Sequence, residues 1–339
     1  MIRQAVFLLM LGVALSPLTE GAAVHAQNAT PSSPRPPAEI PFARLTADAL
    51  VPLALAPGAV DSADALWVPD RAAGTIVRIE AKDNKPGPPV VVGVQPCASL
   101  VVAFDSVWVP LCGDGTIARV DAKTSKVTAT AKTRVAGSDG RIATGVGSVW
   151  AITDRKGVLS RIDPDTNVPV AEIYVAGGAT AVVLADDTLW ITSDDGSPAT
   201  PLRAGRLTRV NPHNNEVVET IDVGPKPGRL AVGEGGVWTL NRGNGTVSRV
   251  DPATNKVVAT ITIGDGVADG EIAAGLGSVW VSAPGVPIIR IDPRTNRAVQ
   301  RFTGEGGGAV LVAHGSLWVA AGPKATWRLD PLLVAATRP

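Results

Sequence analysis

Residues 233–264 read GEGGVWTLNRGNGTVSRVDPATNKVVATITIG, and this stretch contains the pattern that decides the fold. Trp238 and the later motif Arg249-Val250-Asp251 each lie in a short run that alternates apolar and polar residues, which predicts half-buried β-strands. Asn244-Gly245 favours a tight turn between these strands, and residues 251–255 favour a type I turn after the second. The expected strands are residues 229–232, 236–240, 246–251 and 256–263.

The same two signatures recur along most of the chain. A tryptophan beside apolar or small residues returns at separations of 38 to 48 residues, at Trp67, Trp108, Trp150, Trp190, Trp238, Trp280 and Trp318. An Arg-apolar-Asp motif or a close variant follows each tryptophan, starting at Arg78, Arg119, Arg161, Arg209, Arg249, Arg290 and Arg328. Two signals that keep register over seven copies indicate a structural repeat.

Each repeat is too short for a crossover helix and long enough for four short strands. Seven such units predict an all-β fold, a seven-bladed β-propeller of four-stranded antiparallel blades at residues 46–339. The tryptophans are expected to fill the seams between blades, and the arginines to hydrogen bond to adjacent turns or blades. Either residues 49–56 or the tail at 332–339 can complete the seventh blade; the pattern favours the N-terminal segment.

The N-terminal region has the pattern of an export signal. Arg3 precedes an apolar run from Ala5 to Leu15, and Val24-His25-Ala26 is a small-residue cleavage site, so residues 1–26 are predicted to be a signal peptide. The apolar run is shorter than the ~20 residues that span a bilayer. The predicted location is therefore periplasmic or secreted. Residues 27–45 are rich in proline and are expected to form a flexible linker.

Charge composition narrows the classes of partner. The chain of 339 residues has 31 basic and 31 acidic side chains, so the electrostatic attraction that drives most non-specific nucleic-acid binding is missing. We expect no nucleic-acid partner and no membrane span. The loops that join one repeat to the next, and the second strand to the third, emerge on one face, where an unknown protein or a small anionic ligand is expected to bind. An insertion at residues 193–203 adds to this face.

One position near the channel stands out. The ninth residue before each tryptophan lies at the start of the innermost strand, and the seven are Gly58, Ser99, Arg141, Ala181, Arg229, Glu271 and Ala309. Arg141, Arg229 and Glu271 are therefore the candidate ligand-binding residues. Arg229 and Glu271 fall in adjacent blades and can simply pair, which leaves Arg141 without an acidic neighbour at the same position. The other interpretation is an anion-binding mouth.

Two cysteines are the remaining candidate for a specific role. Cys97 and Cys112 flank a hairpin whose turn centres near Phe104 and Asp105, so they should face each other across two strands. In an exported protein such a pair is expected to form a disulfide bond.

The repeats in residues 49–330 resemble the YVTN and virginiamycin B lyase-like propeller superfamily, through stretches such as residues 233–238 and 248–264. The resemblance implies a propeller and raises a streptogramin-lyase activity, in which a Pro-His-Gly-Ile motif supplies a catalytic histidine. The matching stretches here, Pro96–Leu100, Asp139–Ile142 and Pro227–Leu230, contain no histidine. His213 and His314 are expected in surface turns on the opposite face.

The preferred hypothesis is therefore an exported, non-catalytic propeller that acts as a binding or scaffold module. No catalytic residue, metal ligand or cofactor is predicted. A metal-assisted lyase or a lactone-processing enzyme that uses other residues stays the alternative.

Overall fold

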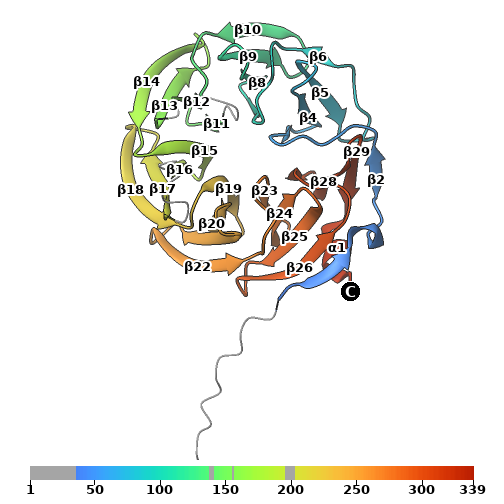
Figure 1. The fold of residues 1–339 in the computed structure, drawn as a ribbon. Helices are drawn as coiled ribbons and strands as arrows, with labels where there is room; N and C mark the ends of the chain where they lie inside the picture. The colour runs from blue at the N-terminus through green and yellow to red at the C-terminus, as the bar shows by residue number, and fades with distance from the viewer. Residues whose placement is uncertain (1–35, 137–140, 155, 195–202) are drawn as a thin grey trace, which may run out of the picture. The chain divides into compact units, whose positions relative to one another are not determined.

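Seven sheets, antiparallel apart from one added parallel strand, lie around a common axis in the part of the chain that the computed structural model describes, residues 36–136, 141–154, 156–194 and 203–339 (Figure 1). The predicted seven-bladed β-propeller is confirmed. We call the four strands of each blade A to D, from the axis outwards. The predicted signal peptide at residues 1–26 lies outside the described residues.

Each blade is a meander of consecutive strands, and the first four blades use β3 to β18. Blade one contains β3 (Val60–Asp61), β4 (Ala65–Asp70), β5 (Thr75–Glu80) and β6 (Val90–Val91), and blade two contains β7 (Val101–Ala103), β8 (Ser106–Leu111), β9 (Thr116–Asp121) and β10 (Val127–Ala131). Blade three contains β11 (Ile142–Gly145), β12 (Ser148–Asp154), β13 (Val158–Asp163) and β14 (Val168–Tyr174), and blade four contains β15 (Gly178–Ala185), β16 (Thr188–Asp194), β17 (Gly205–Asn211) and β18 (Glu216–Val223).

The last three blades follow the same order, except that the N-terminal segment adds an outer strand to blade six and supplies the outermost strand of blade seven. Blade five contains β19 (Pro227–Gly233), β20 (Gly236–Asn241), β21 (Thr246–Asp251) and β22 (Lys256–Thr262). Blade six contains β23 (Glu271–Gly275), β24 (Ser278–Ala283), β25 (Val286–Asp292), β26 (Arg297–Thr303) and, outside them, β1 (Ala38–Pro41). Blade seven contains β27 (Val310–Ala313), β28 (Ser316–Gly322), β29 (Ala325–Leu329) and β2 (Ala49–Val51).

The tight turns lie between strands A and B rather than at Asn244-Gly245. In blade five, Glu234 and Gly235 both have positive φ, 51° and 70°, which is the pattern of a type I′ hairpin turn. Asn244-Gly245 instead belongs to a longer connection between β20 and β21, where Gly245 has positive φ. The expected C-to-D turn is confirmed, because the Asp251 side chain accepts a hydrogen bond from the Ala253 N–H at 2.9 Å.

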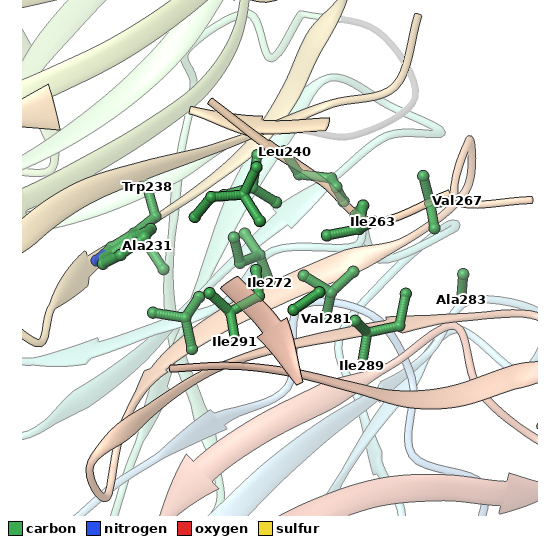
Figure 2. Packing of buried hydrophobic residues seen from close by; sticks show 14 of the residues in the cluster. Ala231, Trp238, Leu240, Ile263, Val267, Ile272, Val281, Ala283, Ile289 and Ile291 are labelled. Carbon is green, nitrogen blue, oxygen red and sulfur yellow. The ribbon is translucent and has the colours of Figure 1, made fainter. Parts of the chain in front are cut away.

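The hydrophobic core is divided among the seven seams between blades. Each tryptophan of the repeat is at most 2% exposed and packs with strands of the following blade. Figure 2 shows one such cluster, in which Trp238 and Ala231 of blade five pack with Ile272, Val281 and Ile291 of blade six. The predicted seam role of the tryptophans is confirmed. A single blade cannot bury both faces, so closing the ring completes the core.

The arginines of the repeat link the same seams at the perimeter. In blade five, the Arg249 guanidinium lies 4.9 Å from the centre of the Trp238 ring and donates to Pro293 O and Asn296 Oδ1 of blade six, at 2.6 and 2.8 Å. Equivalent bonds to the next C-to-D turn are made by Arg119, Arg161 and Arg209, and Arg328 bonds to Asn84 of blade one. The predicted hydrogen bonds to adjacent blades are confirmed at these five seams.

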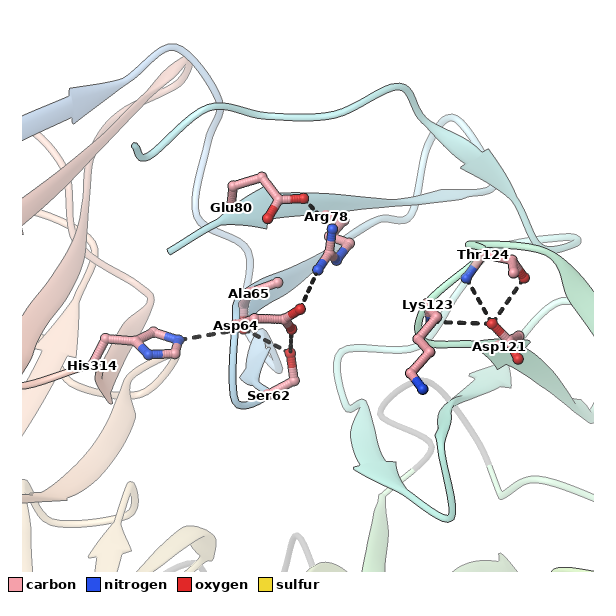
Figure 3. Close-up of polar contacts among 9 residues, drawn as sticks. All are labelled: Ser62, Asp64, Ala65, Arg78, Glu80, Asp121, Lys123, Thr124 and His314. Atoms are coloured by element: carbon pink, nitrogen blue, oxygen red, sulfur yellow. Dashed lines mark hydrogen bonds and ion pairs between the residues drawn. The ribbon is translucent and has the colours of Figure 1, made fainter. Parts of the chain in front are cut away.

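Two arginines of the series have other partners. Arg78 of blade one bonds to Asp64, at 2.7 Å, and to Glu80 (Figure 3). The next C-to-D turn has Ser125 in the place of the usual asparagine, so its side chain is too short to act as the acceptor. Arg290 of blade six bonds to Gln300 Oε1 at 2.5 Å. The following blade has no C-to-D turn, because the residues after its strand C form a helix and its strand D comes from residues 49–51.

The ring is closed by the N-terminal segment, as the pattern favoured. β2 pairs with β29 in antiparallel register, with Leu50 opposite Trp327. The C-terminal tail forms helix α1 (Pro331–Ala336) instead of a strand, and Asp330 caps it by accepting from the Leu332 N–H. Gln300 Nε2 of blade six donates to Val334 O and Thr337 O, at 3.0 and 2.8 Å, and so connects the helix to blade six.

Part of the expected linker is folded against the propeller. Ala38–Pro41 forms β1, which pairs in parallel with β26, and Phe42–Arg44 forms the short 3₁₀ helix η1. Ile40 is fully buried, and the Phe42 ring stacks on Trp327 with centroids 4.7 Å apart. The expectation of a flexible linker across residues 27–45 therefore does not hold for residues 38–44, because two apolar side chains anchor them.

Candidate functional site

The central channel contains a cavity at the predicted site. Its volume is about 270 Å³, and its lining includes Ser99, Arg141, Ala181, Arg229 and Glu271, five of the seven residues at the position nine before a tryptophan. These residues lie near the start of the innermost strands, from two residues before the strand for Ser99 to the fourth strand residue for Ala181, because the chain enters each blade from the same face. Strands β11, β15, β19 and β23 stand around the axis in Figure 1.

The structure brings the three candidate residues together. Arg229 Nε of blade five donates to Glu271 Oε1 of blade six at 2.5 Å, so the expected pairing of adjacent blades is present. Arg141 Nη2 of blade three lies 3.7 Å from the same oxygen. The sequence interpretation that Arg141 lacks an acidic neighbour is therefore wrong. The alignment of repeats suggested contacts between adjacent blades only. In a narrow channel, however, long side chains from blades that are not adjacent also meet.

These charges are largely withdrawn from solvent. The side chains of Arg141, Arg229 and Glu271 are 10%, 11% and 13% exposed. Coulombic interactions are stronger in such surroundings than at an open surface, because water screens them less. Among the described residues that line the cavity, two arginines and one glutamate are the charged ones, so their formal sum is +1.

A polar framework orients Arg141. Its Nη1 donates to Ala98 O of blade two at 2.9 Å, and the Ile142 N–H donates to Ser99 Oγ at 3.3 Å. The same segment is held against blade one, since the Leu100 N–H donates to Gly58 O at 3.1 Å. A Cβ at Gly58 would lie 2.2 Å from the Ala98 carbonyl carbon, so this close approach requires glycine.

A disulfide bond holds the base of that framework. Cys97 and Cys112 are bridged, as predicted, with their Cα atoms 5.2 Å apart. They are not directly opposite each other: β7 and β8 pair Val101 with Trp108, but the isolated pair Pro96–Leu111 is offset by two residues. The bridge joins Cys97, next to the carbonyl that accepts from Arg141, to Cys112, the residue that directly follows strand B of the same blade.

Ala181 is the small residue that lies between the two arginines in the order of the blades. It occupies the same repeat position in blade four that Arg141 and Arg229 occupy in blades three and five. Its side chain ends at Cβ, so it fills less of the cavity than an arginine at the same position would. Residues 137–140, which precede Arg141, and 195–202, in the insertion of blade four, lie outside the described residues.

The two histidines of the propeller lie away from this cavity. His213 is exposed in the C-to-D turn of blade four, and His314 lies in the A-to-B turn of blade seven, both as predicted. His314 Nε2 is 3.5 Å from Ala65 O of blade one (Figure 3). Within the described residues no group of three histidine, cysteine, aspartate or glutamate side chains is arranged to hold a metal ion. None of the described helices is long and apolar enough to cross a membrane.

Comparison with known proteins identifies the fold and no family. No protein-family model and no curated protein matches the chain. Several solved structures match the chain. Hydrazine synthase from Kuenenia stuttgartiensis matches at 16% identity and a TM-score of 0.64, with 82% of this chain and 94% of that chain covered. A streptogramin B lyase matches at 18% identity and a TM-score of 0.61, with 81% of this chain and 93% of that chain covered.

A third similar structure broadens the range of functions. BamB from Moraxella catarrhalis matches at 14% identity and a TM-score of 0.57, over 80% of this chain and 81% of that chain. At these identities the likeness establishes a shared propeller architecture. The function has to be argued from the cavity itself.

Proposed function

We propose that this protein is an exported, non-catalytic binding module that takes a small anion into the mouth of its central channel. The observation that carries the proposal is the meeting of Arg141, Arg229 and Glu271 at one cavity. They come from three different blades and replace the small residues found at this position elsewhere. None of them belongs to the Trp and Arg series that joins the blades.

The chemistry of the guanidinium group supports an anionic ligand. A guanidinium has planar, charge-assisted donors that suit carboxylate and phosphate oxygens. The two guanidinium groups lie beside one carboxylate at a single cavity, so an anion that enters the cavity meets donors from two blades. The short side chain of Ala181 gives such a ligand room between Arg141 and Arg229.

The proposal is tested by titrating inorganic phosphate and acetate into the folded protein by calorimetry. The double variant Arg141→Ala, Arg229→Ala is expected to bind the better of these anions at least tenfold more weakly, roughly 1.4 kcal/mol or more. The matched control is Arg294→Ala, which removes the same charge from a 91% exposed side chain in a C-to-D turn of blade six. Equal affinity in the double variant, or an equal loss in the control, contradicts the proposal.

Glu271→Gln gives a test of opposite sign. The glutamate carboxylate occupies donors of Arg229 that an incoming anion would also use. Neutralising it raises the formal charge of the described lining residues by one, so anion affinity is expected to rise about tenfold. A fall in affinity would mean that Glu271 serves to order the arginines, and the site would then not be an anion receptor of this kind.

Catalysis is the outcome that would replace the binding proposal. The chain is proposed to be a relative of the YVTN and virginiamycin B lyase-like propellers because of its Trp and Arg-Val-Asp repeats. Ring opening of a cyclic depsipeptide that requires a divalent ion and is abolished by Glu271→Gln would establish a lyase. Incubation of purified protein with such a peptide and Mg²⁺, followed by mass spectrometry, makes this measurement.

Export is part of the same proposal. It is supported by the pattern at residues 1–26 and by the disulfide bond, which persists in oxidising compartments. Fractionation of cells that express the full chain should recover a form whose first residue is Gln27 outside the cytoplasm. Recovery of the uncleaved chain in the cytoplasm would contradict export without affecting the anion site.

A further inference from the structure

The walls of the channel are made of strand edges. Within the described residues, each innermost strand is the terminal strand of its sheet, so it has a hydrogen-bonded neighbour strand on one side only. The other edge of β11, β15 and β19 borders the channel. Every second residue of such an edge turns its N–H and C=O outward, and these groups require polar partners, which are water or a ligand.

The surface of the channel is mainly polar, although apolar side chains of these strands contribute to it. Leu100, Ile142, Val182 and Leu230 contribute atoms to the lining, but each belongs to one of the hydrophobic clusters in the seams. A strand turns its side chains to the two faces of the sheet, and in a propeller both faces meet neighbouring blades. Besides backbone edges, the lining therefore contains two residues with hydroxyl groups, Ser99 and Thr144, and three partly buried apolar residues, Val101, Val183 and Leu184.

The size of the cavity limits the ligand to a small metabolite. Its volume of about 270 Å³ lies just below the range of roughly 300–1,000 Å³ that is typical for drug-sized ligands. Charged groups stand at the entry side of the innermost strands, and hydrogen-bonding edges continue along them. A ligand that matches both parts has one anionic group and several hydroxyl groups.

We propose that the ligand of this site is a small polyhydroxylated anion of the sugar-acid class. Its carboxylate binds at Arg141 and Arg229, and its hydroxyl groups bond to the strand edges and to Thr144. This assignment rests on the anion-binding function proposed above. It predicts that the site distinguishes a sugar acid from an apolar acid of equal charge and ring size.

The experiment is a calorimetric comparison of three probes on the full propeller. Glucuronate has the charge and the hydroxyls, cyclohexanecarboxylate has the charge on a six-membered ring without them, and methyl glucoside has the hydroxyls without the charge. Glucuronate is expected to bind at least tenfold more tightly than either. Cyclohexanecarboxylate binding as tightly as glucuronate overturns the sugar-acid assignment and leaves the anion site standing. Methyl glucoside binding as tightly as glucuronate overturns the anion site, and no glucuronate binding overturns the assignment.

A matched pair of variants tests the channel wall. Thr144→Val removes a hydroxyl from the lining at almost constant volume, whereas Thr220→Val makes the same change on the exposed outer strand β18. Thr144→Val is expected to weaken glucuronate binding three- to tenfold and to leave cyclohexanecarboxylate binding unchanged. Equal losses for both acids, or no loss for glucuronate, contradict the assignment. Because Thr220 lies far from the cavity, any change in binding by Thr220→Val measures the effect of a Thr→Val substitution on folding.

Discussion

The seams between blades and the mouth of the channel are built by opposite rules. At the seams, one tryptophan and one arginine repeat in every blade, and five of the arginines donate to the asparagine side chain at the same position of the C-to-D turn in the next blade. At the mouth, the seven equivalent positions hold five residue types, and the charged side chains meet across the channel. The residues that repeat in every blade therefore close the ring, whereas the position that varies between blades forms the proposed ligand site.

The largest expected effect breaks a seam. Trp238→Ala removes a fully buried indole from the cluster between blades five and six, and is expected to cost about 3–5 kcal/mol of unfolding free energy. Trp327→Ala is the matched control, because this eighth tryptophan is half-buried and lies outside the repeat series. Urea unfolding measures both. A loss for Trp238→Ala no larger than that for Trp327→Ala would contradict the seam role.

The disulfide connects the two regions and comes next in size. Cys97→Ser with Cys112→Ser is expected to cost about 3 kcal/mol, because the unfolded chain gains the entropy of an open loop. Anion affinity should also fall, since the segment that offers Ala98 O to Arg141 is then less firmly held. Mass spectrometry after alkylation of the native protein checks the bridge itself. Two alkylated thiols in the wild type would contradict it.

Exchanging asparagine and serine in the C-to-D turns tests whether the asparagine side chain is what binds the arginine of the preceding blade. Asn255→Ser removes the side chain that accepts from Arg209 at 3.0 Å, and is expected to cost about 1 kcal/mol. Ser125→Asn supplies the missing acceptor opposite Arg78, at a position whose φ of 56° asparagine tolerates well, and is expected to gain up to about 1 kcal/mol. Thermal unfolding measures both. The same sign in the two variants would show that the acceptor is not the cause.

The smallest expected effect concerns pH. Hydrogen bonds from the backbone N–H of Ala253 and the Thr254 side chain lower the pKa of Asp251, whose carboxylate is exposed. A lowered folded pKa means that the stabilisation is present above the unfolded pKa of about 3.9 and is lost as the pH falls through the folded value. Asp251→Asn should narrow the difference between unfolding midpoints at pH 7 and pH 3. An unchanged difference would contradict this origin.

The sequence predicted the parts of the fold that repeat. Seven tryptophans in register determine the number of blades, and Ala49–Val51 was recognisable as the closing strand from its position before blade one. β1 was missed because four residues among prolines show no alternation, and its stability comes from Ile40 and Phe42 packing on distant residues. Helix α1 was missed although Asp330-Pro331 is a typical helix start, because the same pair begins the C-to-D turns of other blades.

The candidate site was predictable in composition and not in geometry. The repeat alignment identified Arg141, Arg229 and Glu271 as departures from small residues. It also related Arg229 to Glu271, because adjacent blades follow each other in sequence. The approach of Arg141 to Glu271 spans three blades and depends on the width of the channel, which no local pattern records. The hydrogen bond from Arg141 to Ala98 O could not be predicted either, because every residue has a backbone carbonyl and the sequence does not show which one accepts.

The most direct test of the account is the position of a bound anion. A crystal of the propeller soaked in selenate can be measured at the selenium absorption edge, where the anomalous map locates the anion. The strongest peak is expected in the channel mouth beside Ala181, with the anion's oxygens within about 3 Å of the guanidinium nitrogens of Arg141 and Arg229. Strong peaks at surface lysines and none in the channel would contradict it.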